Sequence, residues 1–231
     1  GQKKLAESRV LVVGAGGLGS PVSLYLAAAG VGTIGIADFD RVDVSNLQRQ
    51  ILYREQDIGK AKAELAVEQL QSRNHSVQVE LYAEGITAEN AEEILAKFDV
   101  IVDASDNFPT RYLLSDTCMK LGKPDVYGAI CEFAGQVTVF ASDGPCLRCL
   151  CPEAEDPSGN PNSAAYGVLG VIPGMIGCMQ AAEVLKLLLG KGEALIGKML
   201  FIDAKTWSTD LIEVPVHPQC SCHAHTKVHR M

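Results

Sequence analysis

The segment 38–50 gathers side chains that could bind a triphosphate. Its sequence is DFDRVDVSNLQRQ, and Asp38 ends an apolar run at about the separation from a glycine turn at which a carboxylate accepts hydrogen bonds from a ribose. Arg49 can hold two phosphate oxygens through its planar guanidinium, while Asn46 and Gln48 add neutral donors. A nicotinamide cofactor carries only a diphosphate and needs no such cluster. We therefore expect this segment to bind ATP and not NAD.

Three residues outside this segment extend the phosphate site. Lys62 begins the next helix and supplies a compact positive charge, while Asp106 and Asn107 follow the fourth predicted strand and offer oxygen ligands for Mg²⁺. With Arg49 they suit nucleotidyl transfer, in which a nucleophile attacks the α-phosphate of ATP and cations offset the charge on the leaving pyrophosphate. This reaction needs no side-chain nucleophile.

A glycine turn earlier in the chain predicts a further contact with phosphate. An apolar strand leads into Gly14, Gly16 and Gly17, and a helix follows with Ser20 and Pro21 at its start. The first N–H groups of a helix have no partner within the helix, so they bind phosphate together with the helix dipole. Alone, this turn would fit any dinucleotide-binding enzyme.

Two clusters of cysteine in the second half of the chain predict a structural zinc site. Cys146 and Cys149 form a CxxC pair, and tetrahedral Zn²⁺ needs two more ligands. Cys220 supplies one of them and pairs either with Cys222, at a shorter spacing, or with His223. We favour Cys222 because a thiolate is the softer ligand. Zinc would then close the loop between residues 149 and 220 onto the sheet.

Alternating strand and helix signals predict the scaffold that positions these residues. Such alternation is typical of a doubly wound, Rossmann-like, mostly parallel sheet, here with added antiparallel strands and a zinc-tethered C-terminal region. The predicted strands are 10–13, 33–37, 77–82, 100–103, one near Val126, 136–140, 199–202 and 210–214. The predicted helices follow the glycine turn and cover 60–72, 91–97, 109–121 and 175–189, and 146–165 is expected to be an irregular crossover.

Length and composition predict a single domain over residues 1–231. Within it, 1–145 forms the nucleotide-binding core, and 146–231 holds the crossover loop, a core helix and the zinc-binding tail. The net charge of −8 disfavours nucleic acid as a partner, and no apolar run looks long and uninterrupted enough to span a membrane. Clustered thiols suit a reducing compartment, so we expect a cytoplasmic location.

Five motifs together resemble the MoeB, ThiF and HesA group of ubiquitin-activating-enzyme-like adenylyltransferases. They are GAGGLG, DxDxVxxSNLQRQ, GKAK at 59–62, DASDN at 103–107 and the CLRC pair. The resemblance implies adenylation of the C-terminal glycine of a small ubiquitin-like sulfur carrier that ends in Gly-Gly, by a homodimer. The residues that it assigns to ATP and its metal are Gly17, Asp38, Asp40, Ser45, Asn46, Leu47, Gln48, Arg49, Lys62, Asp106 and Asn107. Of these, Arg49, Lys62 and Asp106 are implied to lie closest to the chemistry.

The chain departs from this family in two places. Ser163 stands where relatives that form a covalent carrier intermediate have a cysteine, so we expect adenylation only, with transfer to a separate sulfur donor. Cys131 could in principle replace that cysteine, whereas Cys178 is expected to be buried and inert. The family's N-terminal arginine, which reaches the partner subunit's ATP site, is not expected in this chain. Arg9 is expected to be a solvated charge.

Three interpretations remain at this point. The first is a carrier-protein adenylyltransferase that serves molybdopterin, thiamine or a related sulfur-transfer pathway. The second is an enzyme on the same scaffold that activates another carboxylate or acts on modified tRNA. The third is a non-catalytic ATP-binding partner subunit. The motifs favour the first.

Overall fold

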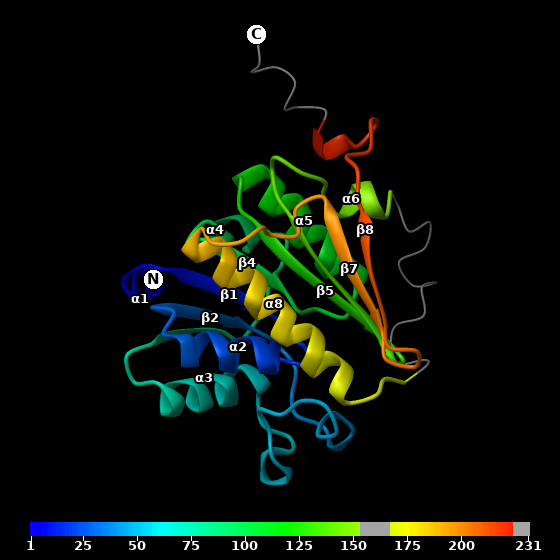
Figure 1. Ribbon diagram of the computed structural model, residues 1–231. Helices are drawn as coiled ribbons and strands as arrows, with labels where there is room; N and C mark the ends of the chain where they lie inside the picture. The colour runs from blue at the N-terminus through cyan, green and yellow to red at the C-terminus, as the bar shows by residue number, and fades with distance from the viewer. Residues whose placement is uncertain (153–166, 224–231) are drawn as a thin grey trace.

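The computed structural model describes residues 1–152 and 167–223, which form one eight-stranded sheet with helices on both faces (Figure 1). The strands are β1 (Arg9–Val13), β2 (Thr33–Ala37), β3 (Gln78–Tyr82), β4 (Val100–Asp103), β5 (Asp125–Cys131), β6 (Ala134–Phe140), β7 (Lys198–Asp203) and β8 (Ser208–Glu213). The helices are α1 (Gln2–Glu7), α2 (Gly19–Ala29), α3 (Lys62–Arg73), α4 (Ala91–Leu95), α5 (Phe108–Leu121), α6 (Leu147–Leu150) and α8 (Val171–Leu189). Short 3-10 helices are η1 (Val44–Asn46), η2 (Glu55–Asp57) and η3 (Ser221–His223).

The sheet joins a parallel part to an antiparallel part. Its strand order is β3-β2-β1-β4-β5-β6-β7-β8, in which all pairs from β3 to β5 are parallel and the later pairs are antiparallel. The chain moves outward from β1 to β3 and then returns to the other side of β1, so the strand order reverses between β1 and β4. This arrangement confirms the predicted doubly wound sheet with added antiparallel strands. Ligands of such sheets bind at the carboxyl ends of the strands beside that reversal.

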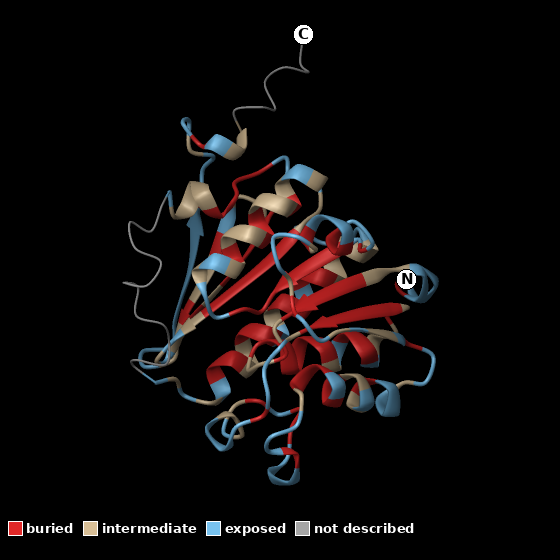
Figure 2. Cartoon of the chain, turned by 180° about the vertical axis from the view of Figure 1, so that it is seen from behind, coloured by how far each residue is buried: buried red, intermediate tan, exposed pale blue. Residues whose placement is uncertain are grey.

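Helices cover both faces of the central parallel strands, so β1, β2 and β4 are almost uniformly apolar. On one face, Val10 and Val12 of β1 join a core cluster with residues of α2, α3 and α8. On the other face, Leu11 and Val13 join a second cluster beneath α4 and α5. Figure 2 shows β2 and β4 buried throughout and β1 buried after Arg9, whereas every residue of β8 is exposed. The crowded centre thus holds the ends of β1 and β4 in place.

Helix α8 is the core helix that the sequence predicts, although it begins at Val171 rather than at 175. Among the helices described, it is long and apolar enough to cross a membrane, contrary to the sequence expectation, but it packs against α2, β5 and β6. Cys178 is exposed, so the prediction that it is buried is wrong. Ile176 and Gln180 face the sheet. Cys178 lies two positions from each of them, so it points to the opposite side of the helix.

Local signals at the start of the chain were partly misinterpreted. The helix after the glycine turn begins at Gly19, and Ser20 does not cap it; its hydroxyl donates to the Gly16 carbonyl oxygen at 2.6 Å. The chain also opens with α1, which no sequence signal predicted, and only Leu5 of α1 is buried. The predicted irregular segment 146–165 contains the short helix α6, and its residues beyond 152 lie outside the part that the structure describes.

Arg9 is not the solvated charge expected from the sequence. Its guanidinium pairs with Glu80 at 2.6 Å, donates to the Lys97 carbonyl oxygen at 2.7 Å and lies 5.2 Å from the centre of the Phe98 ring. Because Arg9 begins β1, it sits at the amino end of the sheet, opposite the crevice. These contacts fix the β1 entrance rather than serve a nucleotide.

A buried carboxyl group lies beneath α5. Asp125 at the start of β5 has no exposed surface, and neither of its carboxyl oxygens has a hydrogen-bond partner among the residues described. Burial raises the pKa of Asp125 well above its usual range, and the nearby Asp103 carboxyl raises it further. The positive charge of Arg111 lowers the pKa but does not cancel the rise. The folded protein therefore favours the protonated form of this group.

Asp125→Asn is expected to raise the free energy of unfolding above that of the wild type at pH 8. At pH 5 the increase over the wild type is expected to be smaller. A carboxyl group with a raised folded-state pKa contributes stability below its ordinary value of 3.8 and loses it as the pH rises through the folded-state value. Urea unfolding at both pH values measures the difference. Asp143→Asn, at an exposed aspartate, is the control. An equal effect of Asp125→Asn at the two pH values would contradict this account.

Candidate functional site

A cavity of about 560 Å³ opens at the carboxyl ends of the parallel strands, beside the reversal of strand order. Its walls come from the ends of β1, β2 and β4, from the N-terminus of α5 and from the loop that follows β2. The predicted residues that line it are Gly14, Gly16, Gly17, Asp38, Asp40, Arg49, Lys62, Asp106 and Asn107. The fold thus brings together side chains from distant parts of the sequence at one sheet edge.

The glycine turn forms one wall of the cavity, and its backbone is tightly packed. Gly14 has φ +95°, and a Cβ at this position would lie 2.6 Å from the Ala104 carbonyl oxygen. Tyr53 holds the turn from the other side, since its hydroxyl donates to the Ala15 carbonyl oxygen at 2.7 Å. Position 14 therefore requires glycine for two reasons: its backbone is left-handed, and the Ala104 carbonyl oxygen leaves no room for a Cβ.

Gly14→Ala is expected to lower the free energy of unfolding by roughly 3 kcal/mol or more, because it combines positive-φ strain with a backbone clash. Gly122→Ala is the matched control. Gly122 also has positive φ, at +66°, but a Cβ there would meet nothing within 4 Å, so only about 1–2 kcal/mol is expected. Chemical denaturation of both variants measures the two costs. Equal losses would show that the clash with Ala104 is relieved.

Asp38, which is partly buried, and Lys62, which is buried, lie in the same wall. The Asp38 carboxylate accepts the backbone N–H groups of Ala15 and Asp40 at 2.7 and 2.8 Å. Burial raises its pKa, while those two hydrogen bonds and the nearby Lys62 ammonium oppose the rise. The Lys62 side chain is only 6% exposed, and its ammonium lies 2.9 Å from Asp40. A cation is thus held at the cavity by a carboxylate that is itself 54% exposed.

Arg49 reaches the cavity from the loop after β2. Its Nη1 donates to the Ser45 carbonyl oxygen at 2.9 Å, which anchors one nitrogen of the guanidinium. The structure places Ser45, Asn46, Leu47 and Gln48 outside the cavity. Asn46 forms a capping box with the preceding backbone, and Leu47 packs against the core. These residues shape the loop that presents Arg49.

Asp106 and Asn107 close the far side of the cavity. The Asn107 side chain accepts the Thr110 N–H at 3.0 Å and caps α5, whereas the Asp106 carboxylate takes part in no hydrogen bond or ion pair within the described ranges. Arg111, which the sequence analysis missed, also lines the cavity and is 9% exposed. It lies between the Phe108 and Tyr127 rings, 5.5 and 5.1 Å away. Its position four residues after Asn107, on the same face of α5, could have revealed it.

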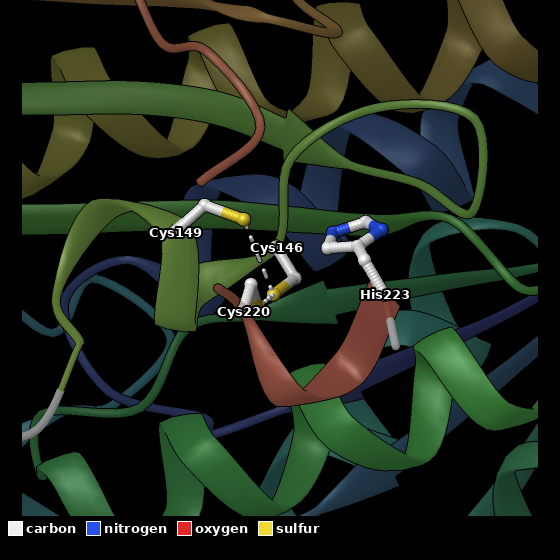
Figure 3. A group of neighbouring side chains, drawn as sticks. All are labelled: Cys146, Cys149, Cys220 and His223. Carbon is white, nitrogen blue, oxygen red and sulfur yellow. Dashed lines mark hydrogen bonds between the residues drawn. The ribbon is translucent and has the colours of Figure 1, made fainter. Parts of the chain in front are cut away.

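A second cluster, remote in sequence from the cavity residues, can hold a metal ion. The ligand atoms of Cys146, Cys149, Cys220 and His223 all lie within 4.8 Å of one another, and Figure 3 shows the four side chains converging from α6 and η3. Cys146 Sγ lies 3.8 Å from that of Cys149 and 3.4 Å from that of Cys220. Sulfur ligands at about 2.3 Å from a tetrahedral zinc lie roughly 3.8 Å apart. The spacing therefore fits such an ion.

Cys222, the predicted fourth ligand, is not among the four side chains that the structure brings together as possible metal ligands. The Cys222 thiol lies 3.3 Å from the Asp116 carboxylate, and His223 is the fourth member of the group. The reason is the helical turn η3, in which the His223 N–H donates to the Cys220 carbonyl oxygen at 3.1 Å. Residues three apart in such a turn share a face, and residues two apart do not.

The remaining thiols lie outside this cluster. Cys151 is partly buried and is not among the four grouped ligands. Cys131 is exposed at the end of β5, directly after Ile130, which lines the cavity. Ser163, the position of the expected missing cysteine, lies outside the residues that the structure describes.

Comparisons with known proteins agree with this geometry. The ThiF family matches residues 1–224. The chain is 50% identical over 220 residues to the SAMP-activating enzyme E1 of Haloferax volcanii, across 95% of this chain and 82% of that protein. It is also 50% identical over 226 residues to the sulfur carrier protein adenylyltransferase of Thermus thermophilus, across 95% and 83%.

A solved structure shares the fold at lower identity. The crystal structure of E. coli MccB with ATP superposes with a TM-score of 0.81 and 24% identity, over 96% of this chain and 68% of that one. This likeness concerns the fold alone. With a family match over nearly its whole length and relatives at 50% identity, the chain belongs to the ThiF family.

Proposed function

We propose that this protein adenylates the C-terminal glycine of a small ubiquitin-like sulfur carrier, of the MoaD or ThiS kind, and releases pyrophosphate from ATP. The names of its relatives, an adenylyltransferase and an activating enzyme, support this proposal. The observation that carries it is the joint presence of Arg49 and Lys62 on the wall of a cavity that the glycine turn completes. Such a cavity suits a triphosphate better than a diphosphate cofactor.

The reaction asks the protein to orient two reactants and to offset charge. One oxygen of the glycine carboxylate attacks the α-phosphorus of ATP, and the bond from that phosphorus to the β-phosphate bridging oxygen breaks. Lys62 and Arg49 offset the negative charge that moves onto the pyrophosphate. Asp38 accepts hydrogen bonds from the ribose hydroxyls, and the glycine turn supplies N–H groups to phosphate oxygens. No covalent intermediate with the enzyme is required.

Mg²⁺ would be held by Asp106, whose carboxylate is free of protein partners within the described residues, with the oxygen of Asn107 beside it. When bound, the ion offsets phosphate charge. We assign the cluster of Cys146, Cys149, Cys220 and His223 to structural Zn²⁺, since three thiolates and one imidazole are a set that zinc prefers.

The product of the proposed reaction is a carrier acyl-adenylate, which a separate sulfurtransferase would consume. Ser163 supports the proposal that the enzyme stops at the acyl-adenylate, because a serine without an adjacent base is a poor nucleophile. Molybdopterin or thiamine synthesis is the pathway that we propose. Reduced cysteines in the zinc site favour the cytoplasm as its location.

We further propose that two copies of the chain pair through an apolar surface beside the cavity. This surface includes a hollow of about 420 Å³ lined by Ile51, Leu169 and Val171, all of which are exposed. Exposed apolar side chains in such a group are typical of an interface between proteins. Arg49 also lines this hollow, so the pairing would lie next to the nucleotide site.

ATP–pyrophosphate exchange with purified carriers tests the proposed function. Exchange is expected only when a carrier ending in Gly-Gly is present, because its carboxylate is the nucleophile. The control is the same carrier without its last glycine, which should support little exchange. ATP binding without exchange for any carrier would instead identify a non-catalytic subunit.

A further inference from the structure

Helix α5 lies between the nucleotide cavity and the metal cluster. Its N-terminal residues, Phe108, Thr110 and Arg111, line the cavity directly after the capping residue Asn107. Its second half packs against α6 and η3, the two short elements that carry the cluster (Figure 1). At about 1.5 Å per residue, Arg111 and Asp116 are roughly 7.5 Å apart along the helix. One rigid element thus touches both sites.

Asp116 contacts both chain segments that supply the metal ligands. Arg148 pairs with it bidentately, Nε to Oδ1 at 2.8 Å and Nη2 to Oδ2 at 2.8 Å, and Arg148 stands between the ligands Cys146 and Cys149. The Cys222 thiol donates a hydrogen bond to Oδ1 at 3.3 Å, and Cys222 lies between the ligands Cys220 and His223 in the sequence. A single carboxylate on α5 is therefore bound to the middle of each ligand pair.

Two further hydrogen bonds tie the same stretch of α5 to the first ligand segment. The Leu147 N–H donates to Ser115 Oγ at 3.1 Å, and the Tyr112 hydroxyl donates to the Cys151 carbonyl oxygen at 2.9 Å. Leu147 itself is fully buried. The helix cannot shift without moving α6, because these contacts lie one turn apart along its axis.

From these contacts we infer that Asp116 is a positioning residue that couples the metal cluster to the nucleotide cavity. A bound metal would hold both ligand segments in place. Through Asp116, these segments would then fix the position of α5 and of Asn107 and Arg111 at the cavity. Binding free energies are reciprocal, so ATP must strengthen metal retention by the factor by which metal strengthens ATP binding. The inference rests on the proposed ATP and zinc sites but not on adenylation.

The test measures the zinc dissociation constant of the full chain by equilibrium competition with a colorimetric chelator, with and without saturating Mg-ATP. ATP is expected to lower the zinc dissociation constant of the wild type by about five-fold or more, the usual lower range of coupling between sites. An unchanged zinc dissociation constant in protein that binds ATP would overturn this inference alone. Protein that binds no ATP, or no zinc, would overturn the inference together with the corresponding assignment in the proposed function.

The variant Asp116→Asn keeps the size of the side chain but loses the charge that holds Arg148. A purely structural role would change the zinc dissociation constant without ATP and leave the ratio of the constants with and without ATP intact, whereas coupling predicts that this ratio falls toward one. Arg148→Lys is the second variant, since a single ammonium cannot hold both oxygens of Asp116. Asp210→Asn, an exposed aspartate on β8, is the matched control. A full ATP effect in both Asp116→Asn and Arg148→Lys would overturn the role of Asp116.

Discussion

Arg49→Ala is expected to reduce carrier-dependent ATP–pyrophosphate exchange by about 1,000-fold or more, because a positioned arginine contributes that much to phosphoryl-type transition states. Arg49 is suited to this role by its place on the cavity wall and by the single anchoring bond to the Ser45 carbonyl oxygen, which leaves the rest of its guanidinium for phosphate. The fold should persist, since Arg49 is only partly buried. Exchange rates and circular dichroism of the purified variant measure the two effects.

Arg73→Ala is the control for this substitution. Arg73 is exposed at the end of α3, remote from the cavity, and the change removes the same charge. Its exchange rate should stay close to the wild-type rate. If Arg49→Ala retained exchange, the phosphate site would have to be assigned to other residues.

His223→Ala is expected to lower zinc affinity by more than about 100-fold, a larger loss than the removal of a residue that only supports a metal ligand. Its imidazole is the fourth group in a cluster whose ligand atoms lie within 4.8 Å of one another. Loss of the ion should also lower the thermal midpoint, because zinc that binds only the folded chain stabilises it. Zinc content by elemental analysis and a thermal melt of the same sample provide the two readouts.

Cys222→Ala is the matched comparison for that experiment. Cys222 precedes His223 directly, but its thiol lies 3.3 Å from the Asp116 carboxylate and is not one of the four grouped ligands. The variant should retain about one zinc per chain. Loss of zinc from Cys222→Ala with retention by His223→Ala would restore the ligand choice that sequence reasoning favoured.

The sheet and its site edge could be predicted because the signals that specify them are local and periodic. Apolar runs followed by Asp38 and Asp103 marked strand ends, and parallel strands bring such ends to one edge. Lys62 could be assigned to that edge from its place at the start of a helix that follows the segment 38–50. In the structure, Asp38 and Lys62 line the cavity, whereas Asp103 is fully buried.

Features that depend on packing or on exact turn geometry could not be obtained in this way. Ligand softness favours a thiolate over His223, whereas the turn η3 decides which side chain shares a face with Cys220. The apolar pattern around Cys178 predicts burial, but it does not show which side of α8 meets the sheet. The place of Arg111 on α5 is a local signal, but its contact with the Tyr127 ring of β5 forms only in the folded chain.

The proposed reaction begins when the carrier carboxylate attacks the α-phosphate of ATP. It is tested most directly by incubating enzyme and carrier with ATP labelled at either the α- or the γ-phosphate, and measuring the label on the carrier. The α-label is expected to stay bound to the carrier in acid until hydroxylamine releases it, while the γ-label leaves in pyrophosphate. Carrier that takes up the γ-label would show that an acyl-phosphate forms, which excludes adenylation.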